Sequence, residues 1–102
     1  MRTAAVYQQG QLAGTLAELE PGRYRFTYAP GYADDPVSLA LPVQPEAYEF
    51  NVFPPVFEGL LPEGPQLEAM LRQHKVDRGD LFTQLLIVGA DVVGSLTVQE
   101  AG

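Results

Sequence analysis

Cysteine is absent from all 102 residues, which excludes disulfides and thiolate metal ligands and favours a reducing compartment. Cations are scarce: six Lys and Arg side chains stand against thirteen Asp and Glu, giving a net charge of −7. Because clustered Lys and Arg bind phosphate backbones, this balance argues against direct nucleic-acid binding. No signal-peptide core is present, and no apolar run approaches the roughly 20 residues of a membrane span. We therefore expect a soluble, cytoplasmic protein.

Side chains that carry catalysis are also few. The one histidine, His74, falls among charged residues at the end of a predicted helix, without a nucleophile or carboxylate partner in range. The two serines, Ser38 and Ser95, fall within predicted strands. Asp34 and Asp35 would supply only half of a cation site, and because no further acid follows in register, a solvated turn is the favoured interpretation. The sequence thus predicts no catalytic residue, metal or cofactor, and an enzyme with an unrecognised site is the least favoured alternative.

The first half of the chain alternates apolar and polar residues as strands do. Strands are predicted over residues 3–8, 12–19, 23–28 and 37–43. Glycine-containing turns at residues 9–11 and 20–22 connect the first three as hairpins. Tyr24, Phe26 and Tyr28 share one face of the third. Residues 44–53 fit an edge segment or a loop equally well.

The second half turns helical. Pro65 begins a helix that ends near Lys75, and a second helix covers residues 81–88, with Asp80 as its N-cap and Gly89 as its C-cap. Residues 91–98 form a last strand. The expected fold is α+β, with a small, mostly antiparallel sheet of about five strands packed with two to three short helices. Residues 1–102 are expected to form one domain.

Residues 54–64 form a rigid apolar run, Pro-Pro-Val-Phe-Glu-Gly-Leu-Leu-Pro-Glu-Gly. Its prolines and glycines prevent a long regular element, yet its four large apolar side chains share one face of a short helical turn. We expect Val56, Phe57 and Leu60 to serve the core and residues 61–65 to be exposed. Glu58 and Glu63 fit solvated rim charges better than an acid–base pair.

The order of these pieces resembles a known family. Residues 38–43, Ser-Leu-Ala-Leu-Pro-Val, followed by residues 55–64, are similar to the N-terminal subdomain of HipA-type serine/threonine kinases. The second helix and the segment Gly89-Ala-Asp-Val-Val-Gly-Ser fit the later part of that subdomain. The resemblance covers essentially the whole chain. The segments Leu-Leu-Pro-Glu-Gly, residues 60–64, and Gly-Ala-Asp-Val-Val-Gly-Ser, residues 89–95, are fairly specific when they occur together.

HipA kinases continue for several hundred residues beyond this point, and their catalytic residues lie there. The resemblance is therefore closer to HipS, the small antitoxin of three-part toxin–antitoxin modules. It implies a non-catalytic inhibitor whose partner is a HipT-like kinase, often with a helix-turn-helix HipB-like protein in the complex.

The stiffness of the proline-rich turn predicts a partner-binding surface. Its residues are Leu61, Pro62, Glu63, Gly64, Pro65 and Gln66. An N-terminal regulatory fragment of a full-length kinase, or an interaction module of another role, stays open. The start at Met1 and the short polar end favour a complete chain.

Overall fold

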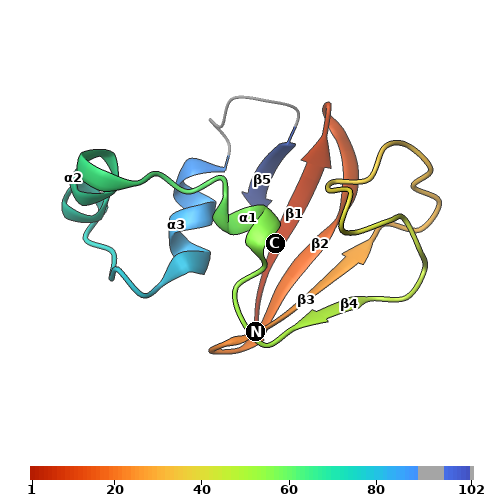
Figure 1. Cartoon of the computed structure of the whole chain (residues 1–102), viewed down its shortest axis with the longest axis horizontal. Helices are drawn as coiled ribbons and strands as arrows, with labels where there is room; N and C mark the ends of the chain where they lie inside the picture. Colours follow the sequence, from red (N-terminus) through yellow and green to blue (C-terminus); the bar gives the residue numbers. More distant parts are fainter. Residues whose placement is uncertain (90–95, 102) are drawn as a thin grey trace.

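The computed structural model describes residues 1–89 and 96–101. Its elements are the strands β1 (Arg2–Gln8), β2 (Gln11–Glu20), β3 (Arg23–Tyr28), β4 (Tyr48–Phe50) and β5 (Leu96–Glu100), and the helices α1 (Pro55–Glu58), α2 (Gly64–His74) and α3 (Leu81–Val88) (Figure 1). The expected α+β fold, a five-stranded sheet with short helices, is confirmed.

The sheet has the strand order β4-β3-β2-β1-β5, and each neighbouring pair is antiparallel. Both predicted hairpins are present, since Gln8 pairs with Gln11 and Glu20 with Arg23 across two-residue turns. Strand β5 returns to β1, where the Thr3 hydroxyl donates to the carbonyl of Ala101 and the Ala101 amide donates to the carbonyl of Thr3, both at 3.0 Å. The first and last strands are therefore held side by side.

One buried cluster joins the sheet to two of the helices. Phe26 of β3 is fully buried, as are Phe57 of α1 and Phe82 and Leu85 of α3. The rings of Phe26 and Phe57 lie 5.7 Å apart between centroids. Figure 1 shows α1 in front of the sheet, α3 beside β5, and α2 farthest from the strands. The core thus lies between the sheet and the α1–α3 pair, and α2 projects from one end.

Gly89 marks the closest approach between a helix and the sheet. The Val98 amide of β5 donates to the Gly89 carbonyl at 3.0 Å. A Cβ atom at Gly89 would lie 2.7 Å from the Val98 carbonyl oxygen, so a larger residue would force α3 away from β5. The predicted C-cap is confirmed, with its amide bonded to the Leu85 carbonyl.

The predicted strand at residues 37–43 is wrong, because this segment folds as a turn. The Leu41 amide donates to the Ser38 carbonyl, and the Ala40 amide donates to the Ser38 hydroxyl. The Tyr28 hydroxyl accepts from the Val37 amide and donates to the Leu41 carbonyl, which fixes both ends of the turn. Local hydrogen bonds of this kind compete with strand pairing, and Leu39 is left 95% exposed.

Two remaining expectations are settled in part. The ambiguous residues 44–53 contain β4, a short strand at the sheet edge. The predicted last strand is confirmed over residues 96–98, within β5, whereas residues 91–95 of that prediction lie outside the described residues.

Candidate interaction site

The chain between α1 and α2 is a stiff connection. Pro54 precedes α1 in an extended conformation and Pro55 occupies its first turn, where a missing amide costs nothing. The turn continues beyond α1, because the Leu60 amide donates to Phe57 and the Leu61 amide donates to Glu58, both at 3.1 Å. The predicted single helical turn is confirmed, and it fixes the direction in which residues 61–66 leave α1.

The structure divides the predicted apolar run differently from the sequence. Phe57 is fully buried, and Val56 and Leu60 pack against the core, as expected. Leu61 also packs against the core, and Pro62 is partly buried, so the expectation that both are exposed is wrong. Leu61 follows directly on the α1 turn and therefore still lies over the hydrophobic cluster.

The outer part of the predicted site consists of Glu63, Gly64, Pro65 and Gln66, all of which are exposed. Glu63 is the extended residue before α2, and its carboxylate does not cap the helix. Gly64 has φ +60°, a left-handed conformation that favours glycine and redirects the chain into α2. Gln66 then lies in the first turn of α2, at the surface.

A hollow of about 190 Å³ lies directly beside this segment. It collects side chains from α1, from the start of α2, from the loop before α3 and from α3 itself. Its lining residues are Glu58, Leu61, Pro62, Glu63, Leu67, Arg78, Leu81 and Gln84. Three of the six predicted site residues, Leu61, Pro62 and Glu63, thus line one concave surface together with groups that are distant in sequence.

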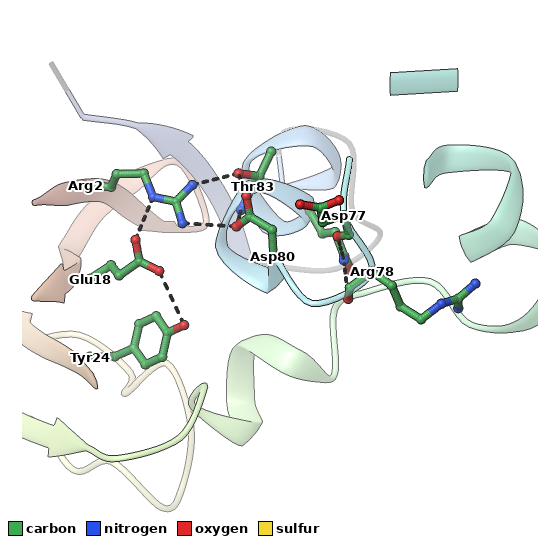
Figure 2. A network of polar contacts seen from close by, with 8 residues as sticks. Arg2, Glu18, Tyr24, Asp77, Arg78, Asp80 and Thr83 are labelled. Carbon is green, nitrogen blue, oxygen red and sulfur yellow. Dashed lines mark hydrogen bonds and ion pairs between the residues drawn. The ribbon is translucent and has the colours of Figure 1, made fainter. Parts of the chain in front are cut away.

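Gln84 holds one wall of this hollow in place. It is 1% exposed, and its Nε2 atom donates to the carbonyls of Asp77 at 3.1 Å and Arg78 at 2.9 Å. The loop before α3 is thereby fixed to the helix. Arg78 forms an ion pair with Glu68 of α2, and Figure 2 shows its side chain extending away from the neighbouring polar network. Sequence reasoning missed both Gln84 and Arg78.

That polar network joins the sheet to the start of α3 (Figure 2). The Arg2 guanidinium donates to Glu18 at 2.7 Å, to the Thr83 hydroxyl at 2.7 Å and to Asp80 at 3.0 Å, and it lies over the Phe82 ring. Asp80 also accepts from the Thr83 amide at 3.2 Å, which confirms its predicted role as N-cap. Every charge here has a partner within the fold, so the network is structural.

The pKa values follow from these contacts. Partial burial alone would raise the pKa of Asp80, but hydrogen bonds from Thr83 and Arg2 outweigh it and lower the pKa below its ordinary value. The hydrogen bond to Glu18 is the largest cause of a raised pKa at Arg2. Both groups are therefore charged at neutral pH, as an ion pair requires.

A second, more apolar hollow lies on another part of the surface. It encloses about 470 Å³ and is lined by Ser38, Ala40, Leu41, Phe50, Pro55 and Val56. The exposed Leu39 belongs to the same turn as three of these residues. None of the predicted site residues line this hollow, so it is separate from the 61–66 segment.

The candidate catalytic residue His74 and the candidate metal ligands Asp34 and Asp35 lie in different parts of the fold. His74 is exposed at the end of α2, and Asp34 and Asp35 are exposed in a loop. Across residues 1–89 and 96–101, no three His, Cys, Asp or Glu side chains gather as metal ligands would. No helix in this described part has both the length and the apolar character needed to cross a membrane.

Comparison with solved structures gives a match over the whole fold. The chain is similar to the N-terminal domain of HipA toxin, with a TM-score of 0.78 and 25% identity, covering 100% of this chain and 94% of that chain.

Two sequence relatives differ in length. An uncharacterized protein of Haemophilus influenzae is 30% identical over 100 residues, covering 98% of this chain and 93% of the relative. Putative kinase Y4dM of Sinorhizobium fredii is 33% identical over 104 residues, covering 87% of this chain. The chain spans only 24% of that kinase's length.

The family model for the HipA N-terminal domain matches residues 4–99, nearly the whole chain. The match is to the N-terminal domain, and the 102 residues do not include a kinase domain. The family identified from the order of the sequence pieces is thus confirmed by sequence and by fold. The chain belongs to the HipA N-terminal domain family.

Proposed function

We propose that this protein is a HipS-like antitoxin that binds a HipT-like serine/threonine kinase and inhibits it without catalysing a reaction itself. One observation carries the proposal: the family match covers residues 4–99 and corresponds to the N-terminal domain alone. The Haemophilus influenzae relative has a similar extent, because 93% of it is matched. In this view residues 1–102 act as one cytoplasmic binding unit, in a complex that can include a helix-turn-helix HipB-like protein.

The contact surface in this proposal is the segment Leu61, Pro62, Glu63, Gly64, Pro65 and Gln66. Its outer four residues are exposed, and the α1 turn with its two prolines stiffens the chain that leads to them. A segment that is already ordered loses little conformational entropy on binding. Docking of a kinase here would therefore carry only a small entropic cost for the segment itself.

The direct test is inhibition of a HipT-like kinase, taken from a reading frame adjacent to the gene of this protein. We expect the purified protein to lower autophosphorylation of that kinase in a dose-dependent manner, measured by transfer of labelled phosphate. Autophosphorylation that is unchanged at saturating protein would contradict the proposal.

Substitution of Gln66 tests the contact surface. Because Gln66 is exposed, Gln66→Ala is expected to weaken the complex by about tenfold, or about 1.4 kcal/mol, with an unchanged melting temperature. Gln73→Ala, on an exposed position of the same helix, is the matched control and should leave both unchanged. Leu61→Ala is less informative, since Leu61 packs against the core and its loss should also destabilise the fold.

A second candidate is the N-terminal regulatory part of a full-length HipA-type kinase. The Sinorhizobium fredii relative supports it, because the matched region is 24% of that putative kinase. The reading frame around the gene distinguishes the two. A separate kinase frame that lacks this domain supports the antitoxin, and a continuous frame supports the regulatory part.

A further inference from the structure

The hollow beside the 61–66 segment has an apolar floor. Leu61, Leu67 and Leu81 come from three different parts of the chain, and Pro62 completes the surface. All four side chains are partly buried, so their outer surfaces still face the hollow. At about 190 Å³ the hollow is smaller than the roughly 300–1,000 Å³ typical of small-molecule pockets. It fits one side chain of a partner protein.

The rim of the hollow carries an excess of negative charge. Glu58 and Glu63 are exposed and line it, and no ion pair engages either carboxylate within residues 1–89 and 96–101. The one cation in the lining, Arg78, is paired with Glu68. Two acidic residues thus line the same concavity without a cationic partner among the described residues.

We propose that this hollow receives one arginine or lysine side chain of the partner kinase. This inference rests on the proposed function and specifies the chemistry of its contact. The aliphatic stem of such a side chain would cover the leucine floor, while its charged head would reach the carboxylates at the rim. A long side chain with an aliphatic stem and a positive head therefore matches both the apolar floor and the negative charge of the rim.

The alternatives conflict with the charges. An apolar side chain would fill the floor but bring Glu58 and Glu63 into an interface with no cation, and removal of charges from water without a partner is costly. An acidic side chain would be repelled by the same carboxylates. A net charge of −7 also favours encounter with a basic surface.

The test compares two double variants of equal charge. Glu58→Gln with Glu63→Gln removes the rim charges, and Glu46→Gln with Glu100→Gln removes two exposed carboxylates elsewhere that are likewise outside every ion pair in the described residues. Each double variant changes the net charge from −7 to −5, by loss of two negative charges. Binding to the neighbouring kinase is measured by calorimetry at low and high salt.

We expect the rim variant to bind about tenfold or more weakly and to lose much of the salt dependence of the dissociation constant. The control variant should stay within about twofold of the wild type, because distant exposed charges contribute little. Melting temperatures of both variants should match the wild type, which excludes a folding defect as the cause.

The outcomes separate this inference from the function on which it rests. If the wild type binds the kinase and both double variants weaken equally, the charges act only through long-range attraction and the inference is wrong. If neither variant weakens, the inference is also wrong while the proposed function stands. If the wild type itself does not bind, the proposed function fails.

Discussion

Gln84 links a helix to a loop through a single buried amide. Its Nε2 atom serves the carbonyls of both Asp77 and Arg78, and the side chain is almost completely removed from solvent. Loss of this amide would remove the donor from both carbonyls, and each hydrogen bond of this kind contributes about 0.5–1.5 kcal/mol. The position of Arg78 beside the hollow therefore depends on a residue that does not reach the surface.

Replacement of Gln84 by methionine, which keeps the length of the side chain, is expected to lower the free energy of unfolding by about 1–3 kcal/mol. Urea denaturation measures the effect. Gln73→Met, at an exposed position of α2, is the control and should change it little. Equal stability of the two variants would mean that water replaces the lost donor.

The sequence could not have identified Gln84, and it placed Leu61 on the apolar face of the short helical turn without fixing its burial. A glutamine between Phe82 and Leu85 predicts an exposed position on a helix, and its partners are backbone carbonyls with no sequence signal. Leu61 follows a proline-rich turn whose exact length decides which side chains still reach the core. Both depend on tertiary contacts between segments that local patterns do not connect.

At the scale of elements, the start of α3 is held by Asp80. This residue caps the helix through the Thr83 amide and pairs with Arg2 of β1. Negative charge is favourable at a helix N-terminus, and the Arg2 contact ties that terminus to the sheet. One carboxylate therefore serves both the helix and its docking.

Asp80→Ala is expected to cost about 0.5–2 kcal/mol of stability at neutral pH. Because the pKa of Asp80 is lowered in the fold from its ordinary 3.8, its contribution is present above about pH 4 and is lost as the pH falls further. The difference between wild type and variant should thus shrink towards pH 2 in acid-dependent denaturation. Asp34→Ala, in an exposed loop, should show no such change, and a pH-independent difference would exclude the ionised cap as the source.

The elements that the sequence predicts well are those with local determinants. The hairpins follow from alternation and from the turns at Gly10 and Gly22, and α3 follows from Asp80 and its apolar face. The segment 37–43 alternates in the same way, yet Tyr28 of another strand binds both of its ends and favours a turn. Alternation alone does not distinguish these two outcomes.

At the scale of the whole molecule, α2 is the least integrated element. It lies at one end of a body that measures 40 × 28 × 26 Å, and Met70 is its buried residue (Figure 1). Regions with few buried apolar contacts open locally at low free-energy cost. The proposed partner-binding segment therefore continues into α2, the element whose local opening a bound partner can reduce most.

Amide hydrogen exchange should reveal this gradient. We expect the amides of α2 to exchange faster than those of α3 and β1, and bound kinase to slow exchange in the first turn of α2. Uniform protection of all three elements in the free protein would contradict this view. A control amide in the β1–β2 hairpin should keep the same rate with and without the kinase.

The paired bonds between Thr3 and Ala101 have a topological consequence. Because the two ends of the described fold meet at one place, its backbone follows a nearly closed ring. A short linker could join these ends while new termini open in the exposed loop at residues 33–35, giving a circular permutant with the same strand pairing. By the same geometry, any polypeptide fused after Ala101 leaves the domain beside the start of β1. In a larger protein that carries this domain, the segments before and after it would therefore both attach at this one place. The surface at residues 61–66 would be connected to those segments only through the domain itself.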